Sequence, residues 1–264
     1  MNNQTTIKLL AVGDVCGSLG RRKVLHTLPA FKKENQIDRV IINAENAADG
    51  NGMTKADALE LFAAGADVLT GGNHTLRRRE VYEFLDQSDF VLRPHNLPGE
   101  AGKGYCLFDM GFASLAVLNL AGRVFLEKSG AENPFHVADR LLEQAKQDGA
   151  RFIAVDFHAE ATSEKRALGL YLDGRVSAFW GTHTHVQTAD EQILPGGTGY
   201  ITDLGMTGPV QSVLGVKSEI IINRLKENDM SKFEAADGEC MLNACLFELD
   251  RATGKTVRVQ RVIL

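Results

Sequence analysis

Residue types that bind metal ions stand shortly after five runs of apolar residues in this chain. In chain order they are Asp14, Glu45 and Asn46, Asn73 and His74, His158, and His183 and His185. Carboxylate oxygens, amide oxygens and imidazole nitrogens are common metal ligands in proteins. If each apolar run is a strand of a parallel sheet, these groups lie at its carboxyl edge, where such folds bind ligands. We therefore expect them to form one metal site.

Each motif also has a structural explanation when it is taken alone. Glycines at positions 13, 17 and 20 could serve a tight turn beside Asp14, and their spacing is not that of a dinucleotide-binding loop. Glu45 and Asn46 could lie in a solvated loop, and a lone histidine is often structural. Four of the seven histidines nevertheless fall in this set, and the rings of His183 and His185, alternate residues of an extended segment, can reach one site. The combination favours a metal site over chance.

The donor set narrows the choice of metal. Mixed oxygen and nitrogen donors without a thiolate suit Mn²⁺, iron or Zn²⁺ and are too rich in nitrogen for Mg²⁺ or Ca²⁺ alone. Cys16 is the one sulfur nearby. The donors outnumber what one tetrahedral ion needs. Two ions about 3.5–4 Å apart, sharing a bridging carboxylate, would use them all.

Short apolar runs alternate with amphipathic segments, which predicts a layered α/β fold. The predicted strands are Ile7–Val12, Val40–Asn43, Asp67–Thr70, Phe90–Leu92, Ser114–Asn119, Arg151–Asp156, Ala178–Gly181, Gly199–Thr202, Met241–Glu248 and Thr256–Val262. The predicted helices are Arg21–Glu34, Lys55–Ala64, Arg79–Asp86, Pro134–Asp148, Ser163–Leu172 and Lys217–Lys226. The last two strands are expected to form an antiparallel hairpin, because apolar and polar residues alternate along them.

Composition is that of an ordinary globular protein. The 264 residues are 44% hydrophobic and 24% charged, with a formal net charge of −5, and we expect a single domain over residues 1–264. The acidic balance argues against a general nucleic-acid or membrane-surface binder, so neither DNA nor a membrane is an expected partner. A polar start without a secretory signal, and apolar runs well short of the roughly 20 residues that span a bilayer, predict a cytoplasmic protein. The four scattered cysteines are expected to be free thiols.

Taken together, these motifs resemble those of the calcineurin-like metallophosphoesterases and, more closely, the bacterial YmdB family of dinuclear phosphodiesterases. The matching segments are Gly13-Asp14, Asn43-Ala44-Glu45-Asn46, Gly72-Asn73-His74-Thr75, Arg93-Pro94 and residues 156–165, 182–190 and 201–209. The resemblance covers nearly the whole chain. It implies a layered α/β/β/α sandwich of the metallophosphoesterase type, with mixed sheets.

The resemblance also implies a role for each site residue. Glu45 would bridge two metal ions, iron or manganese in the first place and zinc as an alternative. The remaining ligands would be Asp14, Asn46 and His185 on one ion and Asn73, His158 and His183 on the other. His74 would not be a ligand and would act as general acid on the leaving oxygen, a role that suits an imidazole.

The chain departs from the family patterns at a few positions. Cys16 stands where the wider superfamily has a histidine ligand, so Asn46 would take its place. Leu76, His95 and Leu97 replace residues that we expect in the closer family, and we expect them to line the mouth of the site. These changes leave the substrate open.

The implied activity is hydrolysis of 2′,3′-cyclic nucleotides, with 3′,5′-cyclic nucleotides as further substrates, by a metal-bound hydroxide. The run of three arginines from Arg77 to Arg79 could be a solvated helix face or could place Arg77 on the substrate phosphate. Arg21 and Arg123 are further candidates for that contact. We expect a homo-oligomer.

Two other functions remain open. One is cleavage of RNA by the same metals, against which the net charge of −5 argues. The other is a regulatory protein that binds a cyclic nucleotide and keeps the metals as structure, in which His74 would have no purpose. A metallopeptidase is disfavoured because the chain has no His-Glu-x-x-His motif.

Overall fold

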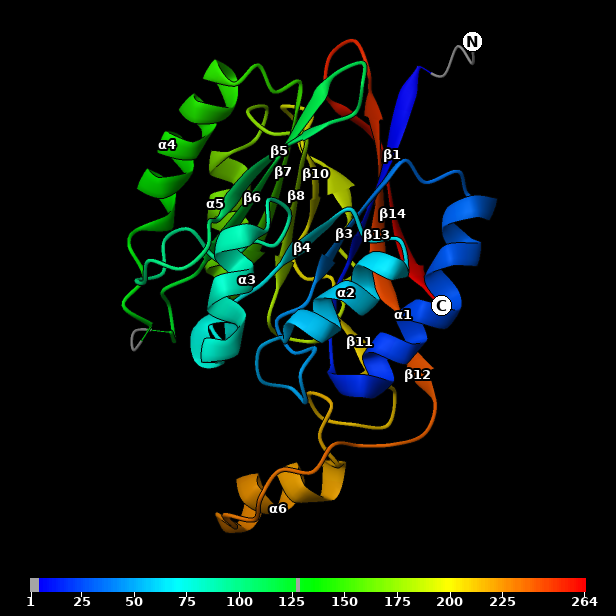
Figure 1. Cartoon of the computed structure of the whole chain (residues 1–264), viewed down its shortest axis with the longest axis vertical. Helices are drawn as coiled ribbons and strands as arrows, with labels where there is room; N and C mark the ends of the chain where they lie inside the picture. The colour runs from blue at the N-terminus through cyan, green and yellow to red at the C-terminus, as the bar shows by residue number, and fades with distance from the viewer. Residues whose placement is uncertain (1–4, 127–128) are drawn as a thin grey trace.

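Two mixed β-sheets form the centre of the protein in the computed structural model, which describes residues 5–126 and 129–264 (Figure 1). The first sheet has the order β14 (Thr256–Ile263), β13 (Asn243–Asp250), β1 (Thr6–Val12), β3 (Arg39–Asn43) and β4 (Val68–Thr70). The second has the order β5 (Tyr105–Asp109), β6 (Ser114–Ala121), β7 (Phe152–His158), β8 (Ala178–Thr182), β10 (Gly199–Ile201) and β9 (Gln192–Ile193). A small third sheet joins β12 (Cys240–Met241), β11 (Met206–Pro209) and β2 (Asp14–Val15).

Alternation along the strands produces the layers. In β1, Leu9 and Ala11 belong to the core between the two sheets, whereas Leu10 and Val12 belong to the core beneath the helices. Successive side chains of a strand point to opposite faces, so both faces of this sheet are apolar and buried. Trp180 and Phe247, with ring centroids 5.8 Å apart, join the sheets across the central core.

Helices cover the outer face of each sheet (Figure 1). The first sheet is covered by α1 (Gly17–Glu34), α2 (Lys55–Ala63) and α3 (Tyr82–Gln87), and the second by α4 (Pro134–Gln147) and α5 (Thr162–Tyr171). Short 3₁₀ turns at Thr75–Arg77 and Arg79–Val81 precede α3. The predicted α/β/β/α sandwich with mixed sheets is therefore confirmed. A sixth helix, α6 (Ser218–Glu227), has no buried residue and projects beyond the sandwich.

Several predicted elements need correction. Phe90–Leu92 is not a strand, because it makes only isolated bridges from Val91 to Leu69 and from Leu92 to Lys103. Helix α1 begins at Gly17, before the predicted Arg21, because the Gly20 amide already donates to the Cys16 carbonyl at 3.0 Å. Position 20 has no room for a side chain, since a Cβ there would lie 2.4 Å from the Thr207 carbonyl oxygen.

The C-terminal hairpin forms as expected but is divided. Strands β13 and β14 pair antiparallel. The predicted strand Met241–Glu248 breaks at Leu242 into β12 and β13, which join different sheets. The sequence did not indicate β2, β5, β9 or β11, of which β2, β9 and β11 are no longer than four residues.

The parallel strands of both sheets end at the same edge. Val12 of β1 pairs with Ile42 of β3, and His158 of β7 pairs with Thr182 of β8. The polar segments that follow these strands therefore meet at one place. Among the described residues, no helix combines the length and apolar composition needed to cross a bilayer. All four cysteines are free.

Candidate metal centre

One group of donor atoms gathers around the His158 ring, which is fully buried at the end of β7. Its Nε2 lies 3.1 Å from Asn73 Oδ1, 3.1 Å from His183 Nδ1 and 3.8 Å from Glu45 Oε1. Atoms that share one metal ion at about 2.1 Å lie about 3.0–3.4 Å from one another. Asn73 and His183 are therefore close enough to His158 to share one ion with it, and Glu45 lies just outside that range. Gly72 permits the approach, because a Cβ there would lie 2.3 Å from the His158 ring.

A second group of donors consists of His185, Asn46 and Asp14. His185 Nε2 is 3.1 Å from the Asn46 side-chain amide and 3.8 Å from Asp14 Oδ1. Cys16 does not replace the superfamily histidine as a donor here, since its Sγ lies 3.7 Å from His185 Nδ1 on the other edge of the ring. The structure thus brings all seven predicted ligand side chains together from both sheets.

Asp14 provides the test of whether a cation fits. Its Oδ2 accepts a hydrogen bond from the His183 amide at 3.1 Å, but its Oδ1 is buried and has no hydrogen-bond partner among the described residues. Burial, with the nearby charge of Asp203, raises the pKa of Asp14 to about 7. Burial likewise raises the pKa of Glu45 to about 8. Two desolvated carboxylates with an unpartnered oxygen fit a site that is completed by positive charge.

The donors are gathered but do not stand in finished coordination geometry. Among the described residues, no three His, Cys, Asp or Glu side chains already surround a common point. Asn46 directs its Nδ2 at His185 and its Oδ1 at His74 Nδ1, 3.2 Å away. Turning this amide by 180° would present its oxygen beside His185.

The histidines of the site are held in the form that binds metals. Burial lowers the pKa of His185 to about 4 and lowers the pKa values of His158 and His183. Neighbouring histidines also lower the pKa values of His158 and His183. For His185, the charge of Lys165 contributes to the lower pKa. Neutral imidazole has a free lone pair for a metal.

Thr182 and Asp156 orient the His158 ring. Thr182 Oγ1 donates to Asp156 Oδ1 at 2.8 Å and lies 3.0 Å from His158 Nδ1, so it accepts the proton of that nitrogen. The Nε2 lone pair is left facing the other donors, as in many metal sites with an outer hydrogen bond. Burial raises the pKa of Asp156 to about 7 against hydrogen bonds from Thr70 and Asn43. Neither residue had a role predicted from the sequence, although a carboxylate inside an apolar strand was a usable signal.

Glu160 orients the His183 ring in the same way. Its Oε2 lies 2.9 Å from His183 Nε2, so His183 Nδ1 remains for an ion. Glu160 stands two residues after His158 in the sequence, but the sequence pattern did not indicate which histidine ring it contacts.

The loop that carries His183 and His185 is strained and anchored. Both residues have positive φ, 98° and 63°, which is unfavourable for residues with a side chain. Between them, Thr184 donates its amide at 3.2 Å and its hydroxyl at 2.7 Å to Asp203 Oδ2. The same oxygen accepts from the fully buried Lys165 Nζ at 2.5 Å. This buried ion pair maintains the loop conformation that aims both rings at the site.

A cavity of about 470 Å³ opens over these donors. Its polar wall includes Glu45, Asn46, His74, His183 and His185. A volume of this size is typical of small-molecule sites.

A model of the YmdB-like protein family matches residues 10–262. The chain belongs to the YmdB-like family. The 2′,3′-cyclic-nucleotide 2′-phosphodiesterase of Bacillus subtilis is 45% identical over 259 residues, covering 98% of this chain and 97% of that protein. A crystal structure described as a novel phosphatase of Mycoplasma pneumoniae is 34% identical with a TM-score of 0.92, covering 98% of this chain and 93% of the other. A hypothetical protein of Thermus thermophilus is 40% identical with a TM-score of 0.90, covering 98% and 99%.

His74 differs from the seven candidate donors of this YmdB-like protein. Its Nδ1 lies 3.2 Å from Asn46 Oδ1 and 3.6 Å from Glu45 Oε1, and its ring also lines the cavity. Its backbone amide donates to Glu45 Oε1. Burial, followed by the charge of Arg77, lowers the pKa of His74 to about 4. The ring is therefore neutral at pH 7 before substrate binds.

The arginines predicted to meet substrate do not line this cavity. Arg21 pairs with Asp57 at 3.0 Å and with Glu60 at 2.8 Å, and Arg77 Nη1 donates to Asn51 Oδ1 at 3.0 Å. Neither belongs to the described walls of the cavity. The ion pairs of Arg21 link α1 to α2.

The positions that depart from the closer family do not line the mouth of the cavity either, contrary to the expectation for Leu76, His95 and Leu97. Leu76 packs against the core between the first sheet and the helices that cover it. The His95 amide donates to the Asn119 carbonyl at 2.8 Å, which holds this segment against β6. Neither of these contacts involves one of the seven candidate metal donors.

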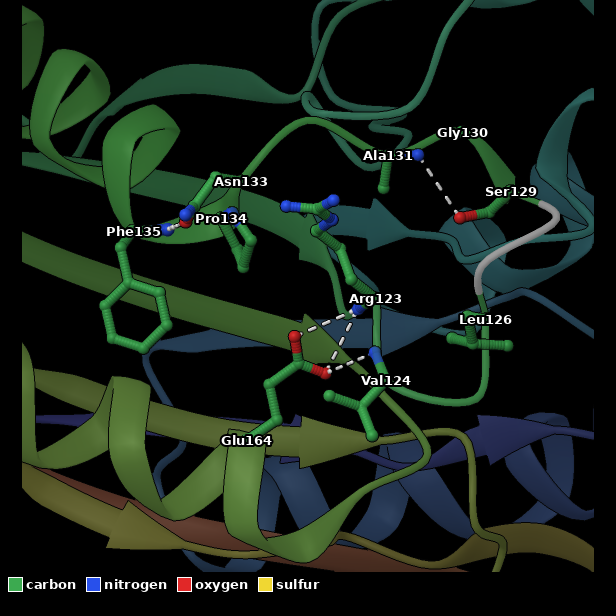
Figure 2. Close-up of a pocket in the computed structure, with 10 residues that line it drawn as sticks. All are labelled: Arg123, Val124, Leu126, Ser129, Gly130, Ala131, Asn133, Pro134, Phe135 and Glu164. Atoms are coloured by element: carbon green, nitrogen blue, oxygen red, sulfur yellow. Dashed lines mark hydrogen bonds between the residues drawn. The ribbon is translucent and has the colours of Figure 1, made fainter.

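A second cavity, of about 560 Å³, lies between the end of β6 and the start of α4 and α5 (Figure 2). Glu164 accepts hydrogen bonds from the backbone amides of Arg123, at 3.0 and 3.1 Å, and Val124, at 3.3 Å. The carboxylate therefore holds the loop. Arg123, a lesser candidate for phosphate, points into this second cavity and is not part of the wall over the metal donors (Figure 2).

Proposed function

We propose that this protein hydrolyses 2′,3′-cyclic nucleotides with the help of two metal ions, with 3′,5′-cyclic nucleotides as further substrates. The observation that carries the proposal is the gathering of seven donor side chains, with an unpartnered buried oxygen on Asp14, beneath a cavity of nucleotide size. The relative from Bacillus subtilis supports the substrate class.

Asn73, His158 and His183 would hold one ion, Asp14, Asn46 and His185 the other, and Glu45 would contact both. Iron or manganese suits this set best, with zinc as the alternative. When bound, such ions offset the charge of a phosphodiester and make water reactive near neutral pH. The chain itself would keep the histidines neutral and leave an oxygen of Asp14 free for an ion. Thr182 would orient His158, Glu160 would orient His183, and Asp203 would hold the loop that carries His183 and His185.

His74 would supply the proton to the leaving ribose oxygen. The ring is neutral at rest, because burial lowers its pKa to about 4. An anionic phosphate beside it favours the protonated ring, so the acid forms when substrate is bound. The Asn46 side-chain amide lies 3.2 Å from His74 Nδ1. With its oxygen turned toward the ion, it would donate an N–H to that nitrogen and hold the ring toward the cavity.

The test combines metal analysis of the purified protein with a panel of substrates. The panel contains 2′,3′-cyclic nucleotides, 3′,5′-cyclic nucleotides, phosphomonoesters and short RNA, each with Mn²⁺ or Fe²⁺ supplied. We expect about two metal ions per chain and fastest turnover of the 2′,3′-cyclic nucleotides. Absence of hydrolysis across the panel would refute the proposal, and cleavage of RNA alone would replace it.

A further inference from the structure

The cavity over the metal donors has a second wall that none of the proposed chemistry uses. It comes from the segment 210–236, which we call the arm and which carries α6 (Figure 1). The side chains and backbone that the arm contributes are apolar or small: Leu214, Gly215, Val216, Ile221, Phe233, Ala235 and Ala236. An apolar wall facing a polar, ion-binding wall suits a ligand with one apolar and one anionic end.

Backbone pairing ties the two ends of the arm together. The Ala236 amide donates to the Gly215 carbonyl at 2.9 Å, and the Lys217 amide donates to the Glu234 carbonyl at 3.0 Å. The side chains of Lys217 and Glu234 also pair at 2.7 Å. The base of the arm is therefore ordered beside the site although α6 itself buries no residue.

Phe233 is the aromatic side chain of this wall. Its ring is half exposed, and the guanidinium of Arg224 lies 4.1 Å from its centroid. Arg224 in turn donates to the Ser231 carbonyl at 3.0 Å. Arg224 is not part of the cavity wall, whereas Phe233 is. Arg224 thus lies over one face of the ring, and Phe233 still lines the cavity.

Building on the proposed function, we propose that the arm is the nucleobase site, with Phe233 stacking on the base while the phosphate lies at the metal donors. A mononucleotide carries its base and its phosphate at opposite ends of the ribose, and the two walls of this cavity differ in the same way. Stacking on an aromatic ring accepts every base, because every base has a π-face. The arm would therefore bind nucleotides without strong choice among bases.

The test is a comparison of two substrates in the full-length, metal-loaded protein. One is 2′,3′-cyclic AMP, and the other is 1-O-methylribose 2′,3′-cyclic phosphate, which has the same cyclic phosphate but no base. Phe233→Ala should lower the ratio of kcat/KM for the nucleotide over the base-free diester by about 5- to 100-fold, mainly through KM. Phe233→Tyr should preserve the ratio. Leu225→Ala is the matched control, because Leu225 lies on the same arm, is 80% exposed and does not line the cavity.

Other results would overturn the proposal. An unchanged ratio in Phe233→Ala would place the base elsewhere, and an equal loss on both substrates would mean that Phe233 only supports the fold. A fall in molar mass of Phe233→Ala by light scattering, with no change in the ratio, would identify the arm as a subunit interface instead. If the wild-type protein hydrolysed neither substrate, the proposed function would fail, and calorimetry would still judge the base site. Equal Kd values of wild type and Phe233→Ala for 2′,3′-cyclic AMP would then refute it.

Discussion

At the scale of single residues, His74 stands apart from the seven candidate donors because its proposed role depends on a proton. Its ring contacts Asn46 and lines the cavity, but burial keeps it neutral in the resting protein. A residue that only fills space would affect all substrates alike. A proton donor should matter in proportion to how poor the leaving group is.

His74→Ala should therefore slow 2′,3′-cyclic AMP hydrolysis by about 10²- to 10⁴-fold. Hydrolysis of methyl p-nitrophenyl phosphate should fall far less, since p-nitrophenolate leaves without protonation. Steady-state kinetics on both substrates, with metal content measured in parallel, would check this. Equal losses on the two substrates at full metal content would contradict the acid role.

Thr182 is the residue whose effect should be read in metal affinity. Thr182→Val keeps the shape but removes the oxygen that lies 3.0 Å from His158 Nδ1. Loss of such an outer hydrogen bond costs about 10- to 100-fold in metal affinity, which calorimetric titration of the metal-free protein with Mn²⁺ would measure.

A buried threonine far from the site provides the control for Thr182. Thr256 Oγ1 donates to the Ser177 carbonyl at 2.6 Å in another part of the molecule. Thr256→Val should cost stability but leave metal affinity unchanged. If both variants bound Mn²⁺ equally well, orientation of His158 by Thr182 would be disproved.

At the scale of elements, the loop after β8 depends on a contact with the segment after β10. Asp203 holds Thr184 in place between the two candidate histidine ligands and is itself neutralised by Lys165. Positive φ at His183 and His185 makes this loop costly to form on its own. The buried ion pair therefore supports the geometry of the site.

Lys165→Met should destabilise the protein by about 3–5 kcal/mol, because it leaves the Asp203 carboxylate buried without a partner. Urea denaturation would give the free energy of unfolding. Adding Asp203→Asn to this variant should recover part of the loss, since no uncompensated charge remains. A loss in Lys165→Met of less than about 1 kcal/mol would show that the pair does not anchor the loop.

At the scale of the whole molecule, the candidate centre takes its donors from both sheets of the sandwich. Asp14, Glu45, Asn46 and Asn73 follow strands of the first sheet, and the three histidine donors follow or end strands of the second. Ions bound by both sets would connect the two sheets. They would also offset the unfavourable burial of the Asp14 and Glu45 carboxylates.

Removing metal should therefore lower Tm of the intact protein. Ligands that bind only the folded state at about 1,000 times Kd add about 4 kcal/mol, which corresponds to roughly 8–16 °C in a chain of this size. Differential scanning calorimetry of chelated protein, before and after Mn²⁺ is restored, would measure the shift. An identical Tm in both states would argue against ions that bridge the sheets.

Local patterns in the sequence were enough to predict a layered α/β fold and a set of candidate donors at the ends of its strands, whereas the α/β/β/α sandwich was implied by the family resemblance. Alternation of apolar residues and the polar residues after each strand are properties of neighbouring positions, so strands such as β1 and β7 and residues such as His158 could be identified without a structure. The resemblance to the YmdB family, confirmed by the family match, supplied the grouping of the donors.

Only the tertiary structure decided what supports and surrounds those donors. Asn43 meets Asp156 across 113 positions of the chain, and Arg21 turns away from the cavity to pair with Asp57 and Glu60. The arm becomes a wall of the cavity only when residues 210–236 return to the site. These features depend on which distant side chains meet in the folded chain, and neither spacing nor composition encodes that locally.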